Sequence, residues 1–410
     1  MSRLAIDGGD PVRANPLKAP PREIGDFEWD ELKRVFDAQT MNRWSGGKLV
    51  DEFETKFAEF YGTGMAVAST SGTSAIHLAV GALNPEPGDE IITAPITDLG
   101  TIIPIVAQNA VPVFADVELD SFNLDPADVE RRVTARTRAI IAVHLGGNPC
   151  DMDRLLEIGR RHNIPVIEDC SQCYCATYKG KWTGQMGVFG CFSLQQSKHM
   201  TTGDGGITVT SDTELGELAR KFGAKGRPLY TADGARHYHS FGFNYNMTEL
   251  QAAVALGQLK RVRWVTETRT RHGELLTSLV RNLPGVHPQK VLPECHSTYW
   301  FYAMRLVEAE AGMSPRRFAD CMRAEGVGCG VHYIGKPIFL YESLRNKQVY
   351  GTSHYPWSLQ DPEHAVRYEE GECPRTEQVL NEMITIPLHE KYSEQDVRDI
   401  AAAMEKVLTA

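Results

Sequence analysis

Short apolar segments alternate with segments of helical periodicity along much of this chain, and this alternation constrains the fold more than any other feature. Five apolar segments stand at residues 65–69, 90–94, 111–115, 139–145 and 165–168. The run at 139–145 is rich in β-branched residues, which is typical of a strand buried on both faces. Apolar residues at helical spacing follow at 71–83 and again from residue 151. Strands that alternate with helices of about a dozen residues predict βαβ units, a mainly parallel sheet and hence an α/β fold.

The chain also divides into three regions that differ in sequence pattern. With 410 residues it is too long for one ordinary compact core. Its first 25 residues are rich in Pro and Gly and predict an extended arm. From about residue 263 the pattern mixes helices, at 316–325 and 394–407, with short strands, at 300–306 and 328–332. We therefore predict an N-terminal arm over 1–25, a large domain over 26–262 and a smaller α+β domain over 263–410.

Composition limits the classes of function. A formal net charge of -10 argues against nucleic-acid binding as the main activity. No apolar run approaches the roughly 20 residues of a membrane span, and residues 1–9 lack the apolar core of a signal peptide. We therefore expect a cytoplasmic location. Nine cysteines are placed irregularly. Cys170, Cys173 and Cys175 suggest a metal site, but no second ligand pair stands at compact spacing, so we expect no metal.

Lys198 is the most informative single residue for function. It lies between the apolar run that ends at Ser193 and the glycine-rich turn 203–206. A lysine presented at such a turn suggests an amine for covalent chemistry on a carbonyl, although most lysines before glycine turns are simply solvated. Burial lowers the pKa of a lysine and leaves a neutral, nucleophilic amine. The freed amine can then also move a proton. This chemistry indicates pyridoxal 5'-phosphate (PLP).

Two further groups fit that cofactor. Residues 70–74 stand at a strand-to-helix junction, where backbone N–H groups favour an anion. Ser71, Gly72 and Thr73 would hold the phosphate, with Ser193 as a further contact, although a plain serine N-cap explains the same pattern. Asp169, at the carboxyl end of a central strand, would keep the pyridine nitrogen protonated, although such a residue often only caps a turn.

These residues occur within longer motifs. They include 168–172 (Glu-Asp-Cys-Ser-Gln), 192–198, 203–206 and 242–253. Over nearly its whole length the chain resembles the DegT/DnrJ/EryC1/StrS family of PLP-dependent aminotransferases, which act on keto sugars and keto cyclitols. The resemblance implies the type I aminotransferase fold, with a seven-stranded-type sheet, and a homodimer that shares its active sites. It further implies that Gln172 contacts the ring hydroxyl and that Asn244 reaches the cofactor phosphate of the partner subunit.

The resemblance distinguishes transamination from dehydration, and the chain departs from the family pattern at two positions. The family's sugar dehydratases carry a histidine where this chain has Lys198, so transamination is favoured. The family usually places an aromatic residue over the cofactor ring where this chain has Asp98, which cannot supply the same contact. Either another residue covers that face or Asp98 addresses the substrate. Asn246 stands where many members have an arginine, which weakens the case for an anionic nucleotide diphosphate there.

The ends of the chain indicate a subgroup. Residues 4–13, 368–374 and 386–389 are similar to inosose aminotransferases and aminohydroxybenzoate synthases, which act on small rings without a nucleotide. Candidate ring contacts, besides Asp98, are Trp44, Ser45, His332 and Tyr333, each of which also fits a structural role. The resemblance thus implies transfer of an amino group from glutamate or glutamine to a cyclitol or sugar ketone, in antibiotic or surface-glycan biosynthesis. Two alternatives remain: a PLP-dependent dehydratase or aromatising synthase, and a PLP-binding sensor without catalysis.

Overall fold

The computed structural model describes residues 3–229, 231, 235–363 and 365–410, and its core is a seven-stranded sheet. The strand order is β1-β9-β8-β5-β4-β2-β3. Only β9 runs antiparallel to its neighbours, so all the other strands share one direction. This confirms the predicted α/β fold with a mainly parallel sheet. The strands are β1 (Met65–Ser69), β2 (Glu90–Thr93), β3 (Val111–Phe114), β4 (Thr137–Val143), β5 (Val166–Asp169), β8 (Phe189–Ser193) and β9 (Gly206–Thr210).

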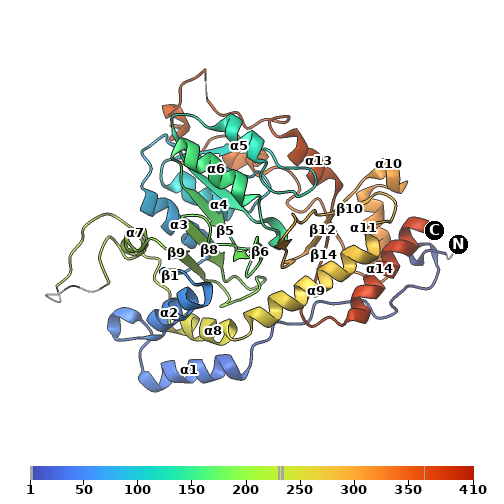
Figure 1. The fold of residues 1–410 in the computed structure, drawn as a ribbon, viewed down its shortest axis with the longest axis horizontal. Helices are drawn as coiled ribbons and strands as arrows, with labels where there is room; N and C mark the ends of the chain where they lie inside the picture. The colour runs from blue at the N-terminus through green and yellow to red at the C-terminus, as the bar shows by residue number, and fades with distance from the viewer. Residues whose placement is uncertain (1–2, 230, 232–234, 364) are drawn as a thin grey trace.

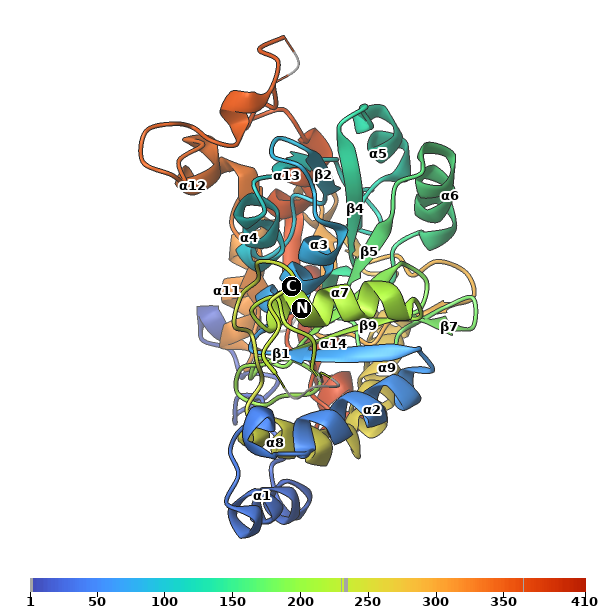
Figure 2. The same cartoon turned by 90° about the vertical axis from the view of Figure 1, so that its left-hand side faces the viewer.

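Helices cover both faces of this sheet (Figures 1 and 2). One face packs on α3 (Gly72–Leu83), α4 (Leu99–Ala107) and α7 (Thr213–Gly223). The other face packs on α5 (Pro126–Arg132), α6 (Met152–His162), α2 (Leu49–Tyr61) and α8 (Glu249–Leu259). Helix α1 (Asp26–Ala38) lies along α8. Because both faces are covered, strands such as β4 are apolar on both sides, as their sequences predict.

Helix starts agree with the capping residues in the sequence. A capping box opens α8, because Gln251 N donates to Thr248 Oγ1 at 3.3 Å and Thr248 N donates to Gln251 Oε1 at 3.1 Å. Ser71 caps α3 and Asp98 caps α4 in the same general way. Both helices therefore begin directly after a strand end, at one edge of the sheet.

A second, four-stranded sheet forms the core of the C-terminal region, in the order β10-β12-β14-β13. Its strands are β10 (Val286–Pro288), β12 (Tyr302–Leu306), β13 (Gly330–Val331) and β14 (Met383–Ile386). The helices of this region are α9 (Val262–Val280), α10 (Glu308–Ala311), α11 (Pro315–Ala324), α12 (Glu342–Arg345), α13 (Pro374–Glu382) and α14 (Glu394–Thr409). A small sheet joins β6 (Thr177–Tyr178), β7 (Lys181–Trp182) and β11 (Cys295–His296). Short 3-10 turns lie at Ala5–Asp7, Arg43–Ser45, Leu145–Gly147, Ile338–Leu340 and Trp357–Leu359.

Two segments cross the division expected from the sequence. Phe339, Trp357 and Tyr368 belong to the C-terminal region but pack on α4 and β3 of the large domain. The N-terminal arm lies on the C-terminal region, where Glu325 accepts hydrogen bonds from the backbone of Ala5 and Val12 at 2.8 and 2.9 Å. Both termini consequently lie at the same end of the molecule in Figure 1. The domain boundaries at residues 25 and 262 stay a prediction.

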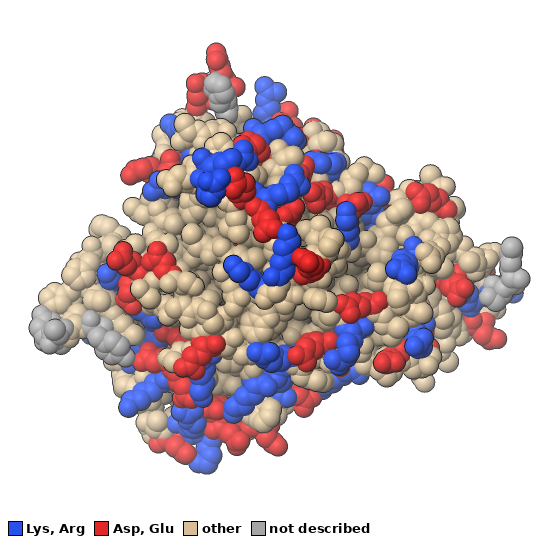
Figure 3. Space-filling view, in the orientation of Figure 1, with Lys and Arg blue, Asp and Glu red and all other residues tan. Residues whose placement is uncertain are grey.

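The surface carries charges of both signs. Figure 3 shows acidic and basic side chains interspersed on this face rather than gathered by sign. Among the described residues, no helix has both the length and the apolar character needed to cross a bilayer.

Candidate active site

A cavity of about 390 Å³ opens at the carboxyl edge of the large sheet. This is where open α/β sheets bind ligands, because the loops after the strands meet there. Nine of the residues singled out from the sequence line it: Ser71, Gly72, Thr73, Asp98, Asp169, Gln172, Ser193, Lys198 and Tyr333. The strand ends of β1, β2, β5 and β8 bring together groups that stand more than 100 residues apart in the chain.

The first wall of the cavity is the N-terminus of α3. Ser71 Oγ accepts from Ser74 N at 3.0 Å, so the structural N-cap that the sequence also suggested is present. The N–H groups of the first helical turn have no intrahelical partner and point out of the helix end. A β-carbon at Gly72 would lie 2.6 Å from the β-carbon of Ser193, so only glycine fits between this turn and β8. The result is a backbone-lined cradle suited to a phosphate.

Asp169 forms the floor at the end of β5 and is buried. Its Oδ2 accepts from Thr101 Oγ1 at 2.8 Å, and its Oδ1 accepts from Ser171 N at 3.0 Å. Thr101 is paired in turn with Thr97 at 2.7 Å between their hydroxyl oxygens. The carboxylate is therefore held in one orientation by neutral donors only. The sequence reasoning missed Thr101, and the signal that could have found it is the pair of threonines that follows β2.

Lys198 lies in the turn after β8 and its Nζ stands 3.7 Å from the centre of the Trp300 ring. Trp300 is itself fixed, because its Nε1 donates to Ser197 O at 2.8 Å. Burial lowers the pKa of Lys198 to about 8, against the opposing effect of the Asp169 and Asp98 charges. A much larger fraction of this amine than of an ordinary lysine is thus neutral near neutral pH and able to attack a carbonyl. Trp300 was also missed, although it stands among four consecutive aromatic residues, Tyr299 to Tyr302.

Gln172 and Tyr333 join the two parts of the molecule across the cavity. Gln172 Oε1 accepts from Gly146 N at 2.8 Å, and Gln172 Nε2 donates to Tyr333 Oη at 3.0 Å. The amide is therefore held by protein groups, with one N–H left for a ligand such as a ring hydroxyl. Tyr333 comes from the loop after β13, so the C-terminal region closes one side of the site.

Other expected contacts lie away from this cavity in the single chain. His332 Nδ1 lies 3.0 Å from Leu380 O, so the imidazole is directed at the backbone. Trp44 donates to Asn246 Oδ1 at 3.1 Å and stacks under the Arg227 guanidinium, while Ser45 only closes the neighbouring 3-10 turn. Asn244 hydrogen-bonds Asn246. The structure does not bring these four expected residues (Trp44, Ser45, His332 and Asn244) to the site of their own chain.

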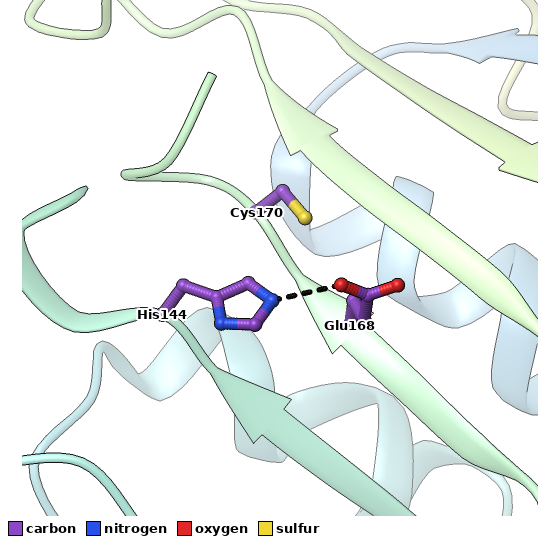
Figure 4. Close-up of side chains that lie close together, drawn as sticks. All are labelled: His144, Glu168 and Cys170. Carbon is purple, nitrogen blue, oxygen red and sulfur yellow. Dashed lines mark hydrogen bonds and ion pairs between the residues drawn. The ribbon is translucent and has the colours of Figure 1, made fainter. Parts of the chain in front are cut away.

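A buried group of His144, Glu168 and Cys170 has the residue types of a metal site (Figure 4). His144 Nε2 lies 3.0 Å from Glu168 Oε2, and His144 Nδ1 accepts from Cys150 N at 3.0 Å. Glu168 also accepts from the backbone N–H of Gly184, Met186 and Gly187. The nitrogen and oxygen ligand atoms are thus already hydrogen-bonded, and burial raises the pKa of the Cys170 thiol. The cluster anchors β5 on the face opposite Asp169, since successive strand residues point to opposite faces.

PLP fits the groups around the cavity. A glycine cradle at a helix N-terminus suits its phosphate, the oriented carboxylate of Asp169 suits its ring nitrogen, and the amine of Lys198 suits its aldehyde. When bound, the cofactor supplies the electron sink that amino-group chemistry needs. The fold and this site define a PLP-dependent aminotransferase of the type I fold.

Comparison with known proteins identifies the family. The model of the DegT/DnrJ/EryC1/StrS aminotransferase family matches residues 26–341 and 337–405, and the chain belongs to this family. A putative L-glutamine:3-amino-2,3-dideoxy-scyllo-inosose aminotransferase of Micromonospora echinospora is 36% identical over 79% of this chain and 78% of the relative. An L-glutamine:2-deoxy-scyllo-inosose aminotransferase of Streptomyces kanamyceticus is 33% identical over 99% of this chain and 97% of the relative. The crystal structure of 3-amino-5-hydroxybenzoic acid synthase superimposes with a TM-score of 0.83 at 27% identity, over 96% of this chain and 99% of that one.

Proposed function

We propose that the protein transfers an amino group from glutamine or glutamate to the ring ketone of a keto cyclitol, or of a free keto sugar, in the cytoplasm. One observation carries the choice of a substrate without a nucleotide. Among the described residues that line the cavity, Lys198 is the only cation and no arginine is present. A nucleotide diphosphate would need cationic partners, for which arginine is the preferred residue. The activities for which the two inosose aminotransferases are named support the same substrate class.

Each role follows from the position of a residue in the cavity. Ser71, Gly72, Thr73 and Ser193 hold the cofactor phosphate, and Gln172 offers its remaining N–H to the ring hydroxyl. Asp169 holds a proton on the ring nitrogen, where its negative charge favours the cation. Lys198 would hold the cofactor through its aldehyde and, as a free amine, would move a proton to or from the reacting carbon.

A panel of ketones tests this function. The pyridoxamine form of the enzyme, prepared with glutamine or glutamate, should convert keto cyclitols to amines that mass spectrometry detects. The matched arms are free keto sugars and nucleotide-linked keto sugars. Turnover confined to the nucleotide-linked compounds would contradict the proposal. A product that has lost a hydroxyl without gaining nitrogen would indicate the dehydratase alternative, and no reaction with any amino donor would indicate a sensor.

We also propose that the enzyme is a homodimer and that Asn244 of the partner subunit completes the phosphate contacts. The segment between α7 and α8 extends away from the body of the molecule (Figure 1). On it Phe241 is fully exposed, and Tyr238 is 60% exposed. An apolar side chain that protrudes in this way is typical of a surface covered by another chain.

Mixed dimers test the sharing of the site. Lys198→Ala and Asn244→Ala should each be impaired alone, whereas subunits exchanged between them should regain up to a quarter to half of the wild-type activity. The gain is expected because one of the two sites in a hybrid then holds an intact Lys198 and an intact Asn244 from its neighbour. Light scattering that gives the mass of one chain, or hybrids with no gain in activity, would contradict the proposal.

A further inference from the structure

The active-site cavity carries an excess of negative charge. Its described lining includes Asp98, Asp169 and Asp204 and a single cation, Lys198. Asp169 is enclosed by its hydrogen bonds to Thr101 and Ser171, and its charge balances the ring nitrogen of the cofactor in the proposed function. In the second half of the transfer Lys198 is a free amine, and even as an ammonium it balances only one of the two remaining carboxylates, Asp98 and Asp204. The lining therefore keeps an excess of negative charge, and a cationic group on the substrate would be attracted there.

Asp98 is the better placed of the two to make a direct contact. It stands between β2 and α4, and its Oδ1 accepts from Gly100 N at 2.8 Å as the N-cap of α4. Within the described part of the chain, its Oδ2 has no hydrogen-bond partner, and the side chain is exposed at the cavity wall. Its charge acts across the cavity on both sides, because it raises the pKa of Lys198 and the pKa of Tyr333. A carboxylate anchored through one oxygen presents the other oxygen to a ligand.

The relatives supply a matched pair of ring ketones. The ring ketones for which the Micromonospora and Streptomyces enzymes are named differ in that the first ring carries an amino group where the second carries a hydroxyl. An amine on such a ring is protonated near neutral pH, so it offers three N–H donors and a positive charge. A carboxylate makes a charge-assisted hydrogen bond with this ammonium group, which is stronger than its bond to the hydroxyl.

Resting on the proposed function, we propose that Asp98 binds an ammonium group on the ketone substrate, so that the enzyme acts on ring ketones that already carry one amino group. Asp98 is then the residue that selects the substrate. The product is a diaminated ring. The substrate must be supplied by an earlier amination of the same ring, followed by oxidation of a second hydroxyl to a ketone. The contact concerns the acceptor ketone, so it acts in the second half of the transfer and not on the amino donor.

The test compares kcat/KM for the aminated ketone with kcat/KM for its hydroxyl analogue. Wild-type enzyme should prefer the aminated ketone by roughly ten- to hundredfold, the range of a hydrogen bond between charged groups. In Asp98→Asn this ratio should fall to near one. Asparagine caps a helix as well as aspartate does, so α4 should keep its N-cap and only the charge is lost. Asp98→Glu keeps the charge and should retain part of the preference.

Asp204→Asn is the matched control, because it removes an equal charge from the same lining. Its ratio should stay within about threefold of the wild-type ratio, since screening weakens a charge that makes no direct contact. A fall as large as that in Asp98→Asn would mean that only the overall charge of the cavity matters and would overturn the assignment to Asp98. A wild-type enzyme that turns over both ketones equally, or prefers the hydroxyl ketone, would overturn the inference and leave the proposed function standing. No turnover of any ring ketone would instead contradict the proposed function.

Discussion

Replacing Lys198 with alanine is expected to lower kcat/KM for amino transfer by about 10⁴-fold or more. The substitution removes both the nucleophile that bonds the cofactor and the base that moves the proton at the reacting carbon, and a general base alone contributes up to about 10⁴-fold. No other described side chain that lines the cavity carries an amine. Steady-state assays with glutamine as donor measure the loss. Turnover within tenfold of the wild-type value would show that the mechanism is wrong.

The variant should remain folded, which separates loss of chemistry from loss of structure. Burial already disfavours the charged amine at this position, as the lowered pKa of Lys198 shows. Its removal costs mainly the contact with Trp300, worth up to about 2 kcal/mol for a desolvated pair. Lys179→Ala is the matched control, because this exposed lysine pairs with Asp153 and lies over the Tyr178 ring on the surface, away from the cavity. Both variants should unfold within a few degrees of the wild-type protein.

The pKa of the same amine gives the pH dependence of cofactor uptake. The neutral amine is the nucleophile, so the rate at which apoenzyme gains the visible absorbance of the bound cofactor should rise with pH. Its midpoint should lie at about 8 rather than at the 10.5 of an ordinary lysine. Asp98→Asn should move the midpoint lower, because the Asp98 charge stabilises the ammonium form. A midpoint near 10 would show that burial does not activate Lys198.

The sequence predicted those parts of the site that depend on one strand and the loop after it. Apolar runs located β1 and β5 within a residue or two, and parallel strands place their carboxyl ends at one edge. The sequence therefore predicts that Ser71, Asp169 and Lys198 meet at this edge. The order of these elements along the chain carried more information than any one motif, since each motif alone has a common structural explanation.

The sequence did not predict contacts between the two parts of the molecule. Trp300 hydrogen-bonds Ser197 across 103 residues of sequence, and Tyr333 reaches Gln172 across 161. Such pairs depend on how the C-terminal region packs on the sheet, for which a local pattern carries no signal. The sequence also did not predict the direction in which side chains point. His332 is adjacent to Tyr333, yet its ring points to Leu380 O and not into the cavity.

Replacing Asp169 with asparagine should lower kcat by about 10²–10³-fold, the range for the loss of one preorganised electrostatic contact. Asparagine has the same shape but no negative charge, so it no longer favours a protonated ring nitrogen, and the cofactor becomes a weaker electron sink. The local hydrogen bonds can persist. Thr101 can turn its hydroxyl to Thr97 and accept from the new amide, while Ser171 N still meets the amide oxygen. Thermal unfolding should therefore change little.

Two comparisons separate the charge of Asp169 from its hydrogen bonds. Thr101→Val removes one hydrogen bond to Asp169 but leaves the charge, so its loss should be nearer tenfold. Asp169→Ala leaves room beside the ring nitrogen for a cofactor analogue that is methylated at that nitrogen and is therefore cationic without any carboxylate. With this analogue, Asp169→Ala should be at least tenfold more active than with the natural cofactor. Equal activities with the two cofactors, or a Thr101→Val loss as large as that of Asp169→Asn, would show that Asp169 acts through position and not through charge.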